Sequence, residues 1–527
     1  MARVKPTYVA VMDTTLRDGE QTPDVAYTPA EKLQLARLLL EEVGVDRIEI
    51  ASTRVSEGER KAARLIARWA RGAGYLKSVE ILGYCDGKAS VDWIAGTGGR
   101  VMNLLTKGSE RHCRSQLGME PAAHRAAVAQ TVRHARRRKL AVNVYLEDWS
   151  SGVTDSPDYV FAMVKLLREL AIERIYLPDT LGIFSPLDVS QYVKRMVRKW
   201  PSQCFEFHAH NDYGLATANC LAAIAAGARG VHTSVNGMGE RTGNTRLAEV
   251  VAAVHDHTQV RTRVHEDRLS AVSRLVEIFS GKDIAANTPI VGRDVFTQTA
   301  GIHADGDLKG DLYTTRLAPA RFGQKRRYAL GKLSGKASVD QNLDALGIGL
   351  TAADRDLVLK RVIELGDKKG ILSIEDLPYI IDDVLKRPGE LQVRVSAWSV
   401  HVGTGETPYA ELTLTYRGRT EKAHATGDGG YDAFMNALAR AARRYRLGLP
   451  RLEDFRVRIP PGGQTAALVE TVITWRPAAR GASTFSTRGV DSDQLAAAVI
   501  ATEKMLNVIA PRPKPRRATR RRAAARA

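Results

Sequence analysis

Two histidines near the middle of this sequence, His208 and His210 in the run FHAHND, are the side chains best suited to chemistry. They end an apolar run typical of a buried strand, where residues two apart point to the same side, so both imidazoles can face one cation. Asp13 ends another such run and would add a carboxylate, giving a mixed nitrogen and oxygen metal site. An H-x-H pair can also be two ordinary histidines. The strand-end position, with Arg17 and Asp18 near Asp13, favours the metal site.

Eight apolar runs that alternate with amphipathic helical stretches must position these residues. The runs are residues 8–16, 47–51, 78–84, 100–106, 141–148, 174–180, 204–212 and 230–237. A helix is expected from Pro29, because Thr28 and Glu31 have the spacing of a capping box. Parallel strands need helical crossovers and eight of them can close, so the pattern predicts a (β/α)8 TIM barrel over residues 1–285. An open doubly wound sheet is the alternative, disfavoured because no G-x-G-x-x-G follows any strand.

The carboxyl ends of the strands in such a barrel form one mouth, where functional groups gather. The polar residues expected at this mouth are Asp13, Arg17, Tyr145, Glu147, Asp148, Asp179, Thr180, His208, His210, Asn211 and the loop 236–244. Each of them alone has a structural explanation, as a turn, core or solvated residue. Their convergence favours an active site.

Three motifs of the chain resemble the signatures of one enzyme family. They are residues 12–21 (MDTTLRDGEQ), 208–212 (HAHND) and 235–244 (VNGMGERTGN). They are similar to the motifs of the enzymes that condense acetyl-CoA with 2-oxoacids: 2-isopropylmalate synthase, homocitrate synthase and, most closely, citramalate synthase. The resemblance implies a metal-dependent Claisen-type condensation followed by hydrolysis of the thioester.

The resemblance also implies which residues carry the reaction. They are Asp13, His208, His210 and Asn244 for a divalent ion (Mn²⁺, Mg²⁺ or Zn²⁺); Arg17, Glu147 and His303 for catalysis; Asp18, Leu82, Leu105, Tyr145 and Thr180 for the 2-oxoacid; and Asp305, Asp311, Leu312 and Tyr313 for acetyl-CoA. The ion would polarise the keto group and Arg17 would stabilise the alkoxide. Glu147 would take the methyl proton of acetyl-CoA, with His303 as its partner or rival. The segment 287–328 is expected to form a lid.

Three of these residues bear on the choice of 2-oxoacid. Leu82, Leu105 and Tyr145 match positions that line the methyl group of pyruvate in citramalate synthases. The implied product is (R)-citramalate, an intermediate of isoleucine biosynthesis. The alternative is 2-isopropylmalate from 2-oxoisovalerate in leucine biosynthesis, because one or two carbons change binding by only about 1–3 kcal/mol. A hydroxyacyl-CoA lyase and a non-catalytic binding protein are rivals from other classes.

The C-terminal third is organised differently. Residues 286–388 are expected to form the lid and helical linker subdomains, and 389–510 a regulatory domain. Within the latter, two similar β-rich units lead into helices at 433–444 and 495–506, which indicates an internal duplication. The part resembles the family's regulatory domain, so a homodimer and a feedback effector, isoleucine or leucine, are implied. Dimerisation without an effector is the alternative.

Composition favours a soluble, cytoplasmic protein. No apolar run reaches the roughly 18 residues of a membrane-spanning helix, and four scattered cysteines indicate no disulfide framework. The net charge is +19, of which eight positive charges lie in residues 511–527, leaving +11 on the rest. That block is expected to be a disordered, solvated tail and not a specific nucleic-acid site.

Overall fold

The computed structural model describes residues 8–310, 312–346, 348–367, 372, 374–385, 393–458, 469–478 and 484–510. The chain divides into two compact units, Met1–Phe296 with Thr314–Arg326, and Thr297–Tyr313 with Arg327–Ala527. The expected tail at 511–527 and the expected boundary at 388–389 lie outside the described residues.

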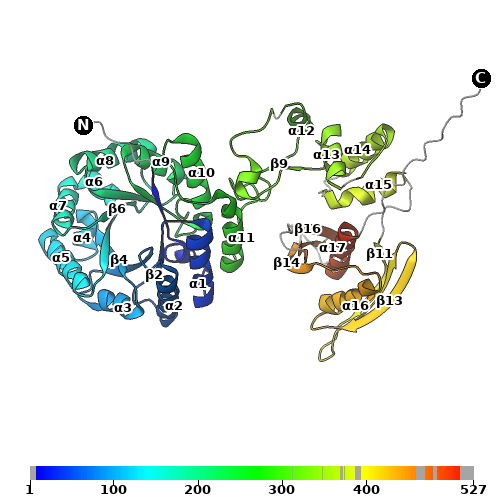
Figure 1. The fold of residues 1–527 in the computed structure, drawn as a ribbon, viewed down its shortest axis with the longest axis horizontal. Coiled ribbons are helices and arrows are strands. Elements are labelled where there is room, and N and C mark those ends of the chain that lie inside the picture. The colour runs from blue at the N-terminus through cyan, green and yellow to red at the C-terminus, as the bar shows by residue number, and fades with distance from the viewer. Residues whose placement is uncertain are drawn as a thin grey trace, which may run out of the picture. The chain divides into compact units, whose positions relative to one another are not determined.

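The first unit is built on a closed barrel of eight parallel strands in chain order (Figure 1). β1 pairs with β8, Ala10 opposite Gly230 and Asp13 opposite Thr233, which closes the ring. The strands are β1 (Ala10–Asp13), β2 (Arg47–Ser52), β3 (Val79–Tyr84), β4 (Val101–Lys107), β5 (Ala141–Glu147), β6 (Arg174–Asp179), β7 (Cys204–Ala209) and β8 (Gly230–Thr233). Each falls within or next to a predicted run, so the predicted barrel is confirmed.

Helices ring this barrel on the outside (Figure 1). They are α1 (Pro29–Arg37), α2 (Glu57–Ala73), α3 (Ala89–Thr97), α4 (Glu110–Ser115), α5 (Pro121–Arg137), α6 (Trp149–Asp155), α7 (Pro157–Glu169), α8 (Pro186–Lys199), α9 (Ala216–Ala226), α10 (Leu247–His257) and α11 (Leu269–Ser280). α2 shows why they form, because Ala63, Ile66 and Ala70 recur at helical spacing and are fully buried. α1 begins with the predicted capping box of Thr28 and Glu31.

A fully buried lysine, Lys32 of α1, connects this helix to the strand ends. Its Nζ donates to the carbonyl oxygens of Leu16, at 2.9 Å, and Ile50, at 3.3 Å. It also pairs with the carboxylates of Glu20, at 2.6 Å, and Glu59. Lys32 therefore fixes the carbonyl that directly precedes Arg17.

Replacing Lys32 with methionine is expected to lower the free energy of unfolding by roughly 3–5 kcal/mol, because it leaves two partly buried carboxylates without their cation. Urea unfolding followed by circular dichroism measures the change. The matched control is Lys194→Met at an exposed position of α8, which should stay within about 0.5 kcal/mol of the parent. Equal stabilities of the two variants would contradict the role given to Lys32.

The second unit contains short and helical elements followed by a duplicated β-rich part. Its elements are β9 (Thr297–Gln298), α12 (Gly301–Leu308), β10 (Arg327–Tyr328), α13 (Lys336–Leu346), α14 (Ala352–Asp367), α15 (Leu377–Leu385), β11 (Val393–His401), β12 (Tyr409–Tyr416), β13 (Arg419–Thr426), α16 (Gly430–Arg444), β14 (Arg451–Arg458), β15 (Val469–Arg476), β16 (Phe485–Asp491) and α17 (Gln494–Ile509). β11–β13 and β14–β16 form two antiparallel sheets, each followed by one helix. The predicted duplication is thus confirmed.

β15 shows the pattern of a sheet with one covered face. Val469, Thr471, Ile473 and Trp475 alternate with less buried residues, as expected for a strand that packs one face on a core. Among the described residues, no helix combines the length and the apolar character needed to cross a membrane.

Candidate active site

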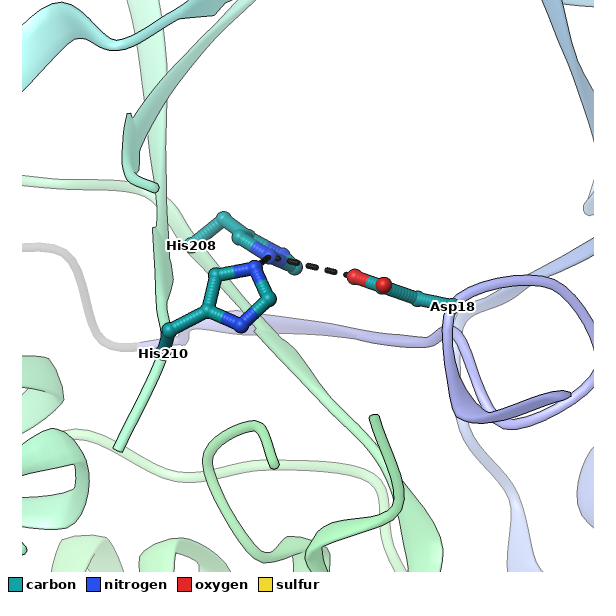
Figure 2. A group of neighbouring side chains, drawn as sticks. All are labelled: Asp18, His208 and His210. Atoms are coloured by element: carbon teal, nitrogen blue, oxygen red, sulfur yellow. Dashed lines mark hydrogen bonds and ion pairs between the residues drawn. The ribbon is translucent and has the colours of Figure 1, made fainter. Parts of the chain in front are cut away.

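Asp18, His208 and His210 meet at the mouth of the barrel, and their side chains turn toward one another (Figure 2). Their ligand atoms all lie within 4.8 Å of one another. His208 Nε2 is 3.3 Å from Asp18 Oδ2 and 3.4 Å from His210 Nε2. All three residues are buried. This is the group of potential metal ligands found in the described part of the chain.

The protonation of His210 and Asp18 suits a cation. Burial, together with the neighbouring His208, lowers the pKa of His210 to about 4, so this imidazole is neutral at pH 7 and has a lone pair to offer. Burial raises the pKa of Asp18, but Arg17 and His208 outweigh it and hold that pKa well below its usual range. A carboxylate and imidazole nitrogens form a donor set that divalent ions accept.

Asn244 joins this group from the loop after β8. It forms an isolated bridge with His210, its side-chain nitrogen donates to Met238 O at 3.0 Å, and its Oδ1 is buried without a partner. Gly243 makes the turn before it possible, because its φ is +83° and a Cβ there would lie 1.8 Å from Gly237 O. The unpaired amide oxygen is available to a cation.

Asp13, which the sequence suggested as the carboxylate ligand, is not a member of this group. The chain leaves the strand after Asp13 and winds into a turn, in which Thr14 O accepts the N–H groups of Arg17 and Asp18 at 3.0 and 2.9 Å. This turn brings Asp18, expected to bind substrate, to the histidines. One Asp13 oxygen accepts a hydrogen bond from the N–H of Thr15 at 2.9 Å, and the other has no partner. Burial raises the pKa of the Asp13 carboxyl to about 7.

Arg17 is held in place by a residue that sequence reasoning missed, Glu49 of β2. Arg17 Nε donates to Glu49 Oε2 at 2.5 Å, and Arg17 also lies 3.5 Å from Asp18. Glu49 is fully buried and accepts a second hydrogen bond, 2.7 Å long, from Asn103. Its signal in the sequence is a carboxylate in the middle of an apolar strand, where a charge needs a partner.

Glu147 stands at the end of β5 and pairs with another residue that was not predicted, Lys107 at the end of β4. The Lys107 side chain is 9% exposed and that of Glu147 23% exposed. The ammonium group thus holds the carboxylate at the rim of the barrel, where it stays accessible to a ligand.

Thr180 directly follows β6 and is oriented by its neighbours. Its Oγ1 accepts the backbone N–H of Asp148 at 2.9 Å, which leaves the hydroxyl proton free to donate elsewhere. Its carbonyl oxygen accepts from Arg241, which also forms two hydrogen bonds, 2.8 and 3.0 Å long, to Asp212. One arginine therefore ties together the loops that follow β6, β7 and β8.

Leu82, Leu105 and Tyr145 come together inside the barrel, in a small apolar cluster with Met12 and Tyr176. The Tyr145 ring lies 6.0 Å from the ring of His208, centroid to centroid. The cluster therefore adjoins the group formed by Asp18, His208 and His210.

The residues expected to bind acetyl-CoA belong to the second unit. In it, the rings of His303 and Tyr313 are in contact, with centroids 4.2 Å apart, and Asp305 pairs with Lys309 at 2.7 Å. Leu312 is 71% exposed. Asp311 lies outside the described residues. The lid and the roles of these residues stay predictions.

Comparisons with known proteins agree with this arrangement. Residues 8–276 match the HMGL-like family model, 290–370 the homocitrate synthase post-HMGL domain-like model, and 372–510 the LeuA allosteric (dimerisation) domain. A putative (R)-citramalate synthase of Methanopyrus kandleri is 35% identical over 88% of this chain and 89% of its own length. A probable 2-isopropylmalate synthase of the same organism is also 35% identical, over 96% and 99%. The (R)-citramalate synthase of Methanocaldococcus jannaschii is 32% identical over 95% and 99%.

Proposed function

This chain belongs to the family of citramalate and 2-isopropylmalate synthases, acetyl-CoA-dependent acyltransferases, and from that premise we propose that it converts pyruvate and acetyl-CoA to (R)-citramalate. The observation that carries the proposal is the meeting of Asp18, His208 and His210 beside Arg17 and the apolar cluster that contains Leu82, Leu105 and Tyr145.

Asp18, His208 and His210, with the amide oxygen of Asn244, would hold a divalent ion. The fit rests on their closely spaced donor atoms and on the buried Asn244 oxygen without a partner. Such an ion supplies Lewis-acid polarisation of the keto carbonyl. The residues suit Mg²⁺, Mn²⁺ or Zn²⁺.

The remaining roles follow from side-chain chemistry. Arg17, kept in place by Glu49, donates to the oxygen that becomes an alkoxide as the new carbon–carbon bond forms. Thr180 has a free hydroxyl proton for the substrate carboxylate. Glu147 removes a proton from the acetyl methyl group, and water then cleaves the thioester and releases free CoA.

The pocket supports pyruvate as the 2-oxoacid. Leu82 and Tyr145 are only 3% and 2% exposed, and Leu105 packs beside them. Bulky side chains of this kind, placed around the keto carbon, would leave room for a methyl group and crowd an isopropyl group. The second candidate is 2-isopropylmalate synthase, favoured by a relative of that name that is as similar as the citramalate synthase.

The C-terminal unit supports dimerisation and feedback. The match of residues 372–510 to the LeuA allosteric (dimerisation) domain is the basis for a homodimer. The effector would be the end product of the pathway, isoleucine for citramalate and leucine for 2-isopropylmalate.

The test is release of CoA thiol from acetyl-CoA by the full-length protein supplied with Mn²⁺, comparing pyruvate with 2-oxoisovalerate, each with and without isoleucine or leucine. Preference for pyruvate and inhibition by isoleucine are expected. Preference for 2-oxoisovalerate and inhibition by leucine would replace the proposal by its alternative. Cleavage of a hydroxyacyl-CoA without condensation would overturn both.

A further inference from the structure

Beside Asp18, His208 and His210, the barrel interior holds a series of polar contacts in which Tyr145 is the only residue used in the proposed function. His232, the third residue of β8, is 1% exposed and lies between Tyr145 and Glu206. Its Nδ1 is 3.2 Å from the Tyr145 hydroxyl, and its Nε2 is 3.2 Å from Glu206 Oε2. Glu206 in turn accepts from Arg47 at 2.5 Å.

The charges along this series set the direction of each hydrogen bond. The Arg47 guanidinium pairs with Glu206 at 2.5 Å, which holds Glu206 as a carboxylate. A neutral imidazole carries one proton, which it shares with only one of its two partners. A carboxylate can only accept, so the single imidazole proton lies on Nε2, and Nδ1 is left as an acceptor.

Tyr145 must therefore donate its hydroxyl proton to His232. Glu49 is the other acceptor in reach, but it is farther away, at 3.5 Å, and its Oε2 already accepts from Arg17. When the Tyr145 hydroxyl donates to His232, its oxygen can accept a hydrogen bond from Arg17 Nη2, which is 3.5 Å away.

Tyr145 contacts two groups that the proposed reaction uses, Leu82 and Arg17. Its ring packs with Leu82 in the pocket proposed for the pyruvate methyl group, and the Arg17 guanidinium lies over the ring, with its Cζ 5.8 Å from the ring centre. A rotation of this ring would change the pocket and the environment of Arg17 together.

We infer that His232 is a positioning residue for the condensation. It accepts a hydrogen bond from the Tyr145 hydroxyl and so fixes the Tyr145 side chain, which forms the pocket wall and contacts Arg17. The inference rests on the proposed function. In this view the substrate specificity of the pocket depends on His232, although His232 does not itself line the pocket.

Three variants test it. His232→Leu removes both hydrogen bonds, His232→Asn loses the ring but keeps an acceptor, Oδ1, near the position of Nδ1, and Tyr145→Phe removes the donor. We expect His232→Leu and Tyr145→Phe each to lower kcat with pyruvate about tenfold, the size of one lost buried hydrogen bond. The double variant should be no worse than either single one, and His232→Asn should stay within about threefold of the parent.

Thermal melting separates positioning from folding. Both His232 variants lose the bond to Glu206, so both should melt at a lower temperature than the parent, whereas only His232→Leu should lose turnover. The matched control is His134→Asn in α5, which loses a 3.0 Å contact to Asp92 on the surface and should keep its kinetics. Additive losses in the double variant, or equal losses of kcat in His232→Asn and His232→Leu, would overturn the inference.

If the parent enzyme uses neither 2-oxoacid, the proposed function is wrong, but the role of His232 can still be tested by spectroscopy. In protein labelled with ¹⁵N-histidine, the His232 signals, assigned by their loss in His232→Asn, should show a protonated Nε2 and an unprotonated Nδ1. Tyr145→Phe should shift the Nδ1 signal. A proton on Nδ1 would refute the inference whatever the substrate.

Discussion

Replacing Asp18 with asparagine is expected to weaken Mn²⁺ binding by about 100-fold or more and to reduce turnover in parallel. The neutral amide removes the charge that faces His208 at 3.3 Å, and loss of an outer partner of a metal ligand alone costs about 10–100-fold. Isothermal titration with Mn²⁺ measures the affinity in the absence of substrates, so this result does not depend on which reaction the enzyme catalyses.

The matched control is Asp13→Asn. Asp13 is outside the group formed by the two histidines, and its pKa is raised to about 7 by burial, so the neutral amide should leave Mn²⁺ affinity within about threefold of the parent. The opposite pattern, with Asp13→Asn losing the ion and Asp18→Asn retaining it, would restore Asp13 as the ligand.

A second large effect is expected at Glu147. Glu147→Gln should lower kcat by roughly 10²–10⁴-fold, the usual contribution of a general base, while Mn²⁺ affinity stays unchanged. The change keeps the size of the side chain and removes its ability to take a proton. Release of CoA thiol measures turnover, and exchange of the acetyl methyl protons with deuterated solvent in the presence of the 2-oxoacid measures the proton transfer itself.

Glu173→Gln is the control for this prediction, since the Glu173 side chain is 71% exposed and pairs only with its neighbour Arg174 in the described contacts. It should leave both readouts unchanged. If Glu147→Gln kept its exchange rate and His303→Gln lost it, the base would be His303.

The barrel could be predicted because its signals are local. Eight apolar runs with helical crossovers leave few arrangements, and Thr28 and Glu31 set the start of α1 through contacts between near neighbours. His208 and His210 could be placed for the same reason, since the alternation of a strand fixes their direction.

The carboxylate that lies beside the two histidines, Asp18, could not be predicted in this way. Continuing the strand from Asp13 to Leu16 assumes that the alternation persists, but the Thr14 carbonyl accepts the N–H of Arg17, Asp18 and Gly19, and the strand ends. Glu49 and His232 were missed because their contacts, with Arg17 and with Tyr145, join residues 32 and 87 positions apart, which no local pattern reveals.

The hydrogen bonds of Tyr145 limit which mutations can change the substrate specificity of this protein. A change at Tyr145 would leave His232 without its donor and disturb the Arg17 site at the same time. Leu82 and Leu105 have apolar side chains that take no part in those hydrogen bonds, so they can change size singly. Divergence toward larger 2-oxoacids is therefore most accessible through the two leucines, and laboratory selection for such substrates should accumulate mutations there first.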